Sequence, residues 1–113
     1  MALAYITKIG AIYSELNEDI SNIDEMLSFV TGEDEDIFMT TTPCEIETLA
    51  TNCGLEKAHS IATDGMVYAA FDKLNNATEE NFNRYMEFHY SICEAPDVVG
   101  ASMHGLWIGR KIE

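Results

Sequence analysis

The chain has 113 residues, 47% of them hydrophobic, and this length predicts one domain spanning residues 1–113. Twenty acidic residues outweigh six basic ones, so the formal net charge is −14. Because phosphate contacts need a basic surface, this charge argues against nucleic acids and anionic membranes as partners. No apolar run is long enough to span a bilayer, and residues 1–7 lack the pattern of a signal peptide. We therefore expect a cytoplasmic protein.

Residues 33–36 read EDED and follow Gly32 directly. Such a run is typical of a solvated loop that aids solubility. The alternative is that the chain is a decoy that imitates the charge of DNA, which requires carboxylates spaced along a ridge rather than gathered in one loop.

The three cysteines, Cys44, Cys53 and Cys93, are an odd number at wide spacings. This pattern predicts neither a disulfide framework nor a zinc site, and the apolar neighbours favour buried free thiols. The clustered carboxylates lack the spacing of a calcium loop. We therefore expect no metal.

The first third of the chain predicts one strand and helical segments. Residues 2–7 form a short apolar run that indicates a buried strand, which Gly10 is expected to end. Residues 11–18 can form one or two helical turns, and a helix is expected at about 22–31. Its apolar side carries Ile23, Met26, Leu27 and Val30.

The clearest helix signal lies at residues 43–53. Thr42 is a good N-cap, Pro43 occupies the first helical position, and Glu45 completes a capping box. Gly54 is suited to the left-handed position after the helix. The side chains expected to face inward are Ile46, Leu49 and Ala50.

Residues 55–62 alternate as a strand does, and Asp64-Gly65 then predicts a turn. Two helices are expected next, at about 66–75 and 78–94. The apolar stripe of the second contains Phe82, Tyr85, Met86, His89, Ile92 and Cys93.

A loop at 97–102 leads to a last strand at 103–112, where HGLWIGRKIE alternates with a period of two. The apolar face is expected to carry His104, Leu106, Ile108 and Ile112. The fold class is therefore α/β, with a small mixed sheet of about three strands covered by helices. Strand 2–7 is left with an unpaired edge, which predicts self-association or a partner chain.

Two phrases carry a resemblance to a known family: PCEIETLATNCGLEKAHSIATDG and NATEENFNRYMEFHYSICEAPDVVGASMHGLWIGRK. They resemble the C-terminal part of bacterial class I S-adenosylmethionine-dependent methyltransferases of a small-molecule branch, most closely over residues 42–65 and 78–111. The resemblance implies a partial Rossmann-like fold. It also implies that residues 103–112 run antiparallel between strands 2–7 and 55–62.

The same resemblance implies S-adenosylmethionine as cofactor, held in this family by a glycine-rich turn and an acidic residue in the first half of the fold. The glycines of this chain form no such turn. We therefore expect the chain to correspond to the substrate-side lobe, without tight cofactor binding of its own.

Five residues are candidates for contact with a substrate: Tyr5, Tyr68, His89, Tyr90 and His104. His89 is either a core histidine bonded to backbone or a general base or substrate ligand. His104 favours a structural bond to the loop 100–102. Tyr5 is either core packing or a ligand contact at the carboxyl end of its strand.

Two functions remain open from the sequence. The first is the C-terminal lobe of a small-molecule methyltransferase, inactive as an isolated chain. The second is an acidic protein-interaction module, a regulator or inhibitor, built on a similar scaffold.

Overall fold

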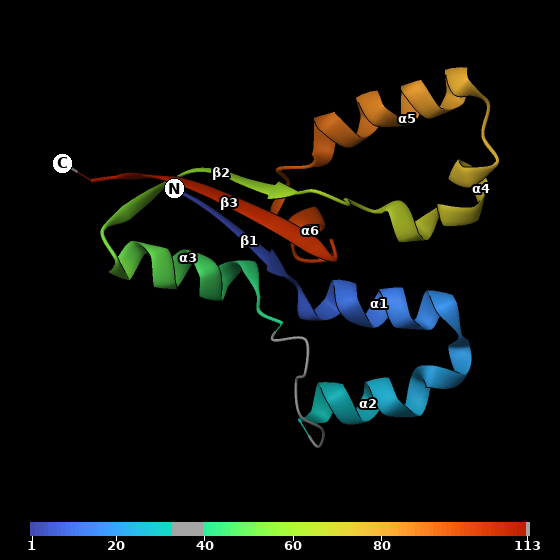
Figure 1. Cartoon of the computed structure of the whole chain (residues 1–113), viewed down its shortest axis with the longest axis horizontal. Helices are drawn as coiled ribbons and strands as arrows, with labels where there is room; N and C mark the ends of the chain where they lie inside the picture. Colours follow the sequence, from blue (N-terminus) through green and yellow to red (C-terminus); the bar gives the residue numbers. More distant parts are fainter. Residues whose placement is uncertain (33–39, 113) are drawn as a thin grey trace.

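The computed structural model describes residues 1–32 and 40–112, so the acidic run at 33–36 lies outside the described residues. Its centre is a sheet of three strands, β1 (Ala2–Ile6), β2 (Leu55–Ala62) and β3 (His104–Lys111). The order is β1-β3-β2, and β3 runs antiparallel to both neighbours (Figure 1). The predicted central position and direction of the last strand are confirmed.

The register of β1 leaves one of its edges open. Met1 and Gly109 exchange two backbone hydrogen bonds of 2.8 and 2.9 Å, and Leu3 lies opposite Trp107. By the antiparallel alternation, the N–H and C=O groups of Ala2 and Ala4 point away from β3. No other strand among residues 1–32 and 40–112 pairs with this stretch of the edge.

The edge is covered at the far end of β1. The N–H of Thr41 donates to the Ile6 carbonyl (2.9 Å), and Thr7 and Thr41 form a parallel bridge. The open part of the edge is therefore Ala2–Ala4.

One face of the sheet is buried under helix α3 (Pro43–Asn52). Trp107 is 1% exposed and packs with Tyr5 and with Ala50 of α3. The half-buried side chains around this cluster are Leu3, Ile46 and Leu55.

The expected inward face of β3 was wrong. Gly105, Trp107 and Gly109 are buried, whereas Leu106 and Ile108 are half-buried. A Cβ at Gly105 would lie 2.3 Å from the Tyr5 ring, and one at Gly109 would lie 2.2 Å from the Trp107 ring. The two glycines therefore make room for aromatic rings on the buried face. The expected inward set also included His104 and Ile112, which are both exposed.

The segment after β1 is a helical hairpin made of α1 (Lys8–Glu18), η1 (Ile20–Asn22) and α2 (Ile23–Thr31). Gly10 lies inside α1 rather than ending the strand, because the Thr7 hydroxyl accepts the Gly10 N–H (3.0 Å) and starts the helix. Helix α1 is therefore longer than the one or two turns expected.

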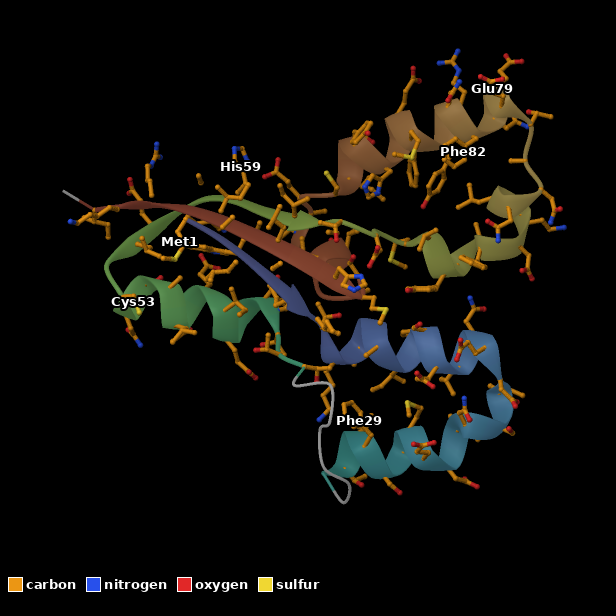
Figure 2. All side chains as sticks on the ribbon, viewed as in Figure 1. Met1, Phe29, Cys53, His59, Glu79 and Phe82 are labelled. Atoms are coloured by element: carbon orange, nitrogen blue, oxygen red, sulfur yellow. The ribbon has the colours of Figure 1, made fainter. Side chains whose placement is uncertain are left out.

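A small second core joins α1 to α2. Ile12, Met26 and Phe29 are buried together, and Phe29 points from α2 toward α1 (Figure 2). The predicted apolar side of α2 was correct only at Met26, because its other members lie on the outer face. These exposed residues are Ile23, Leu27 and Val30.

The predicted start of α3 is confirmed. The Thr42 hydroxyl accepts the Glu45 N–H (3.2 Å), and the Glu45 carboxylate accepts from the Thr41 hydroxyl (2.8 Å) instead of reaching back to Thr42. Gly54 has the expected positive φ of 83°. Leu49 is 59% exposed, contrary to expectation, because α3 packs on the core through Ala50 and Ile46 instead.

The cysteines are free, as predicted, but they are not buried. Cys44 and Cys53 are exposed and Cys93 is half-buried. Cys44, near the start of α3, lies at a surface groove that Lys57 and Ser60 of β2 also line, and Cys53 is the residue that ends α3.

The second half of the chain differs from its prediction at two places. Residues 66–75 form a short turn η2 (Val67–Ala69) and α4 (Phe71–Asn75) rather than one helix, and part of the expected loop forms α6 (Pro96–Val99). The long helix α5 (Glu79–Ile92) is confirmed, with Thr78 as its N-cap.

The molecule is a thin plate of 48 × 42 × 17 Å with a radius of gyration of 15.7 Å. A compact chain of this length has a radius of gyration of about 13 Å. Two helical arms, α1–α2 and α4–α5, extend from the same end of the sheet (Figure 1). Within the described residues, no helix is both long and apolar enough to cross a membrane.

Candidate functional site

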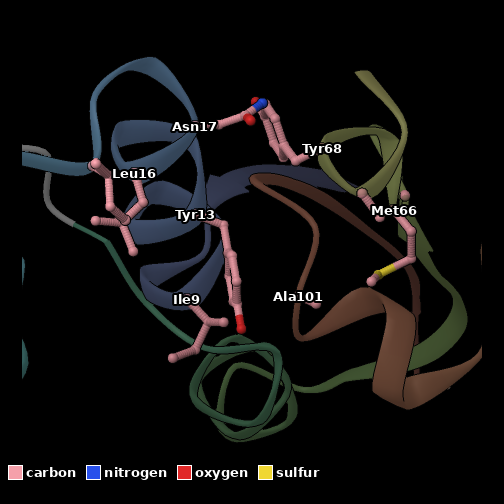
Figure 3. Close-up of a pocket in the computed structure, with 10 residues that line it drawn as sticks. Ile9, Tyr13, Leu16, Asn17, Met66, Tyr68 and Ala101 are labelled. Atoms are coloured by element: carbon pink, nitrogen blue, oxygen red, sulfur yellow. The ribbon is translucent and has the colours of Figure 1, made fainter. Parts of the chain in front are cut away.

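The candidate site lies where β1 and β2 end and β3 begins. A larger groove of about 610 Å³ opens there between α1 and the segment after β2. Figure 3 shows Tyr13 of α1 and Met66 of the opposite wall on two sides of it. The remaining lining residues are Ile9, Leu16, Asn17, Ile20, Gly65, Tyr68, Ala69 and Ala101. Ligands of open α/β sheets bind beyond the carboxyl ends of the strands, so this groove has the position of a ligand site.

Ser102 links three segments of the chain beside the larger groove through hydrogen bonds. It is fully buried, and its hydroxyl accepts the N–H groups of Asp64 (3.2 Å) and Gly65 (3.1 Å) while donating to the His104 carbonyl (2.9 Å). The Thr7 hydroxyl donates to the Ser102 carbonyl. The start of α1, the turn at 63–65 and the loop before β3 are thus fastened to one another; we call this the turn junction.

Asp64 and His104 form a pair at the turn junction. One carboxylate oxygen of Asp64, Oδ2, lies 2.6 Å from His104 Nδ1 and accepts the His104 N–H at 2.8 Å. In a neutral imidazole held this way, the proton sits on Nδ1 and Nε2 is free to accept a proton. The ring is half-exposed, so a ligand can reach Nε2.

His89 lies on the other side of the turn. It is 8% exposed, and a Cβ at Gly65 would lie 2.6 Å from its Nδ1. Gly65 also has a positive φ of 60°, so both the backbone and the space favour glycine there. Within the described residues, His89 is buried as a core histidine would be, but its ring makes no hydrogen bond to backbone.

A smaller groove of about 260 Å³ lies between α4 and α5, and His89 and Asp64 both line it. Phe82 projects from α5 into the space between the two helices (Figure 2). Burial raises the pKa of the Tyr85 phenol, which also lines this groove. The other lining residues are Thr63, Val67, Phe71, Leu74, Asn75 and Met86.

The structure gathers three of the five candidate residues at the turn junction. His104 pairs with Asp64, His89 packs against Gly65, and the Tyr68 hydroxyl donates to Met103 Sδ (3.1 Å). His104 does bond to the loop 100–102, as expected, but through its backbone carbonyl, which accepts from the Ser102 hydroxyl. Its ring contacts Asp64 instead.

Tyr5 and Tyr90 lie apart from this group. Tyr5 is buried under α3, where its hydroxyl has no hydrogen-bond partner. Burial raises its pKa, and the nearby Ser60 hydroxyl offsets this only in part, at a geometry short of a hydrogen bond. Tyr90 is 69% exposed on α5, beside the His89 ring.

Sequence reasoning assigned Asp64 only to a turn, gave no role to Thr7, and included Ser102 only as part of the loop that His104 was expected to contact. A signal was available for Asp64, because an acidic residue directly after a strand stands where ligand contacts gather. No local signal marks Ser102, because the two N–H groups that its hydroxyl accepts lie 37 and 38 residues away.

The described residues do not fit S-adenosylmethionine. Helix α1 directly follows β1, and its first turn leaves no room for a ligand. The Thr7 hydroxyl accepts the Gly10 N–H, and a Cβ at Gly10 would lie only 2.3 Å from Met103 Cα. No free helix N-terminus therefore faces the larger groove from this strand. Within the described residues, no group of three His, Cys, Asp or Glu side chains is placed to hold a metal ion.

Comparisons of the chain with family models, with curated proteins and with solved structures find no match.

Proposed function

We propose that this chain is the C-terminal, substrate-side lobe of an S-adenosylmethionine-dependent methyltransferase that acts on a small molecule. One observation carries the proposal: β3 lies antiparallel between two strands that run parallel to each other. This is the arrangement of the last three strands in the family that the sequence resembles.

The open edge of β1 supports the same proposal. The outward N–H and C=O groups of Ala2 and Ala4 offer a site for one further strand. In the proposed enzyme, the first half of the sheet continues from this edge and binds the methyl donor, which agrees with the poor fit of this chain to the donor.

In this proposal the larger groove holds the apolar part of the methyl acceptor and keeps water away from it. Methyl transfer needs alignment of the acceptor more than acid–base chemistry. For an acceptor that must lose a proton, His104 is the candidate base, because Asp64 holds Nδ1 and leaves Nε2 free.

The test is to co-express the chain with the polypeptide encoded directly upstream in its source genome. We expect methyl transfer from tritium-labelled S-adenosylmethionine into a small-molecule extract when both parts are present, and none with either part alone. Ala4→Pro removes an outward N–H from β1 and should abolish the transfer, whereas Ala4→Val keeps the N–H and should preserve it. Tight donor binding by the isolated, monomeric chain would contradict the proposal.

A second candidate function is an acidic protein-interaction module. The net charge of −14 favours it, together with the exposed apolar residues Ile23, Leu27 and Val30 on α2 beside Asp24 and Glu25. A basic partner should then be recovered from lysate at low salt and lost at high salt. Recovery of no partner at any salt concentration would exclude this function.

A further inference from the structure

We propose that the smaller groove between α4 and α5 is a second binding site, separate from the larger groove, for a single-ring aromatic amine. Its polar contacts are the Asp64 carboxylate and the His89 imidazole. This inference does not depend on methyl transfer, because the site consists of residues of this chain alone.

The His89 imidazole in the smaller groove has no hydrogen-bond partner within the described residues. His89 is more than nine-tenths buried, it lines the smaller groove, and no described residue offers it a hydrogen bond. In the described part of the chain, the two enclosed polar atoms without a partner are Tyr5 Oη and Trp107 Nε1. The His89 nitrogens are not among them, so they retain some access to solvent or to a ligand.

One oxygen of the Asp64 carboxylate is available to a ligand. Both contacts to His104 use Oδ2, and Oδ1 has no hydrogen bond or ion pair within the described residues. The Asp64 carboxylate and the His89 imidazole both line the smaller groove. They offer two kinds of acceptor, the imidazole at whichever ring nitrogen carries no proton. A ligand that carries several N–H donors on one atom, such as an ammonium group, suits both.

The rest of the smaller groove is mostly apolar and aromatic. Phe71, Phe82 and Tyr85 line the groove together with Val67 and Met86. Aromatic faces favour both a ring and an adjacent cation. The volume of about 260 Å³ lies below that of pockets for drug-sized ligands, so the ligand is the size of one ring with a short chain.

Charge selects among ligands of this size. The chain carries a net charge of −14, and its formal charge in the groove comes from Asp64. Aromatic carboxylates are therefore repelled, and a neutral alcohol of the same shape lacks the charge-assisted bond.

The test uses phenethylamine as the probe and ¹H–¹⁵N correlation spectra of the whole chain. We expect saturable shifts at the amides of Asp64, Met86 and His89, with at least tenfold weaker binding of 2-phenylethanol and no binding of 3-phenylpropanoate. Asp64→Asn should weaken the amine at least tenfold.

Asp64 also supports the turn junction, so Asp64→Asn could weaken binding by disturbing the fold. A pair of phenylalanine variants on α5 tests the site without changing that junction. Phe82 lines the groove and is 45% exposed, whereas Phe88 on the same helix is 53% exposed and lies outside it. Phe82→Ala should weaken phenethylamine at least fivefold, and Phe88→Ala should leave its affinity unchanged. Equal affinity for amine and alcohol, equal effects of the two variants, or shifts centred on Tyr13 and Met66 of the larger groove would overturn the proposal. None of these results bears on methyl transfer, which is measured with both lobes.

Discussion

At the scale of residues, the core of this protein depends on two glycines that receive aromatic rings. Gly105 lies against Tyr5, and Gly109 lies against Trp107. Burying these rings leaves two polar atoms, Tyr5 Oη and Trp107 Nε1, without hydrogen-bond partners. The close packing of the rings therefore comes with lost hydrogen bonds. The effect of one of them on the free energy of unfolding can be measured by replacing Tyr5.

Tyr5→Phe should raise the free energy of unfolding at pH 7 by about 1 kcal/mol, because it removes a buried hydroxyl that has no partner. Urea denaturation followed by the fluorescence of Trp107, the single tryptophan, measures the change. A loss of stability would show that the hydroxyl is bonded in solution, and Ser60 would be its partner.

The gain in stability from Tyr5→Phe should depend on pH. Burial raises the pKa of Tyr5 above its usual 10.0, so below pH 10 the phenol is neutral in both the folded and the unfolded chain. As the pH rises above 10, the unfolded chain ionises first and the folded chain loses stability. The advantage of Tyr5→Phe over the natural sequence should therefore grow between pH 10 and pH 11. Tyr85 ionises in both proteins, so its effect cancels in the comparison.

Gly65→Ala should destabilise the fold more than Gly54→Ala does. Both glycines have positive φ, which costs alanine about 1–3 kcal/mol. A Cβ at Gly54 meets nothing within 4 Å, whereas one at Gly65 meets the His89 ring. The difference between the two variants in urea denaturation reports the contact with His89, and equal losses would mean that His89 does not pack on the turn.

At the scale of elements, the sequence predicted those structures whose determining residues lie close together in the chain. Helix α3 was predictable because its cap, Pro43 and Gly54 act over a few residues. The buried face of β3 was not, because glycine gives no hydrophobic signal and its burial comes from Tyr5 on another strand. The junction of Asp64 with His104 spans 40 residues and follows from the register that pairs Ala62 with Gly105.

The cap of α3 provides a prediction at this scale. Thr42→Ala should lower the free energy of unfolding by about 1 kcal/mol, because the Glu45 N–H loses its acceptor. Thr48→Ala, at an exposed position inside the same helix, should be neutral or slightly stabilising. Thermal or urea denaturation of the two variants separates the cap from general helix propensity.

At the scale of the whole molecule, the plate exposes more surface than a compact protein of its mass. Its accessible surface is 7701 Å², against about 6,200 Å² expected for a 12.6 kDa monomer. The outer side of α2 and the edge of β1 contribute exposed apolar and unpaired backbone groups. Both are expected of a lobe that is completed by a partner.

We therefore predict that the isolated chain self-associates through β1. Sedimentation should give a mass that rises with concentration, and Ala4→Pro should shift the association to at least tenfold higher concentration. Ala4→Val should leave it unchanged. Association that persists equally in the proline variant would assign it to another surface, such as α2.

The most direct test of the central claim is the DNA sequence immediately upstream of the Met1 codon, read in all three forward frames. The account predicts that one frame encodes a strand, a glycine-rich turn opening a helix, and an acidic residue that ends a second strand. If no frame encodes these elements, the chain is not the second lobe of a methyltransferase encoded at that locus, and the central claim is wrong.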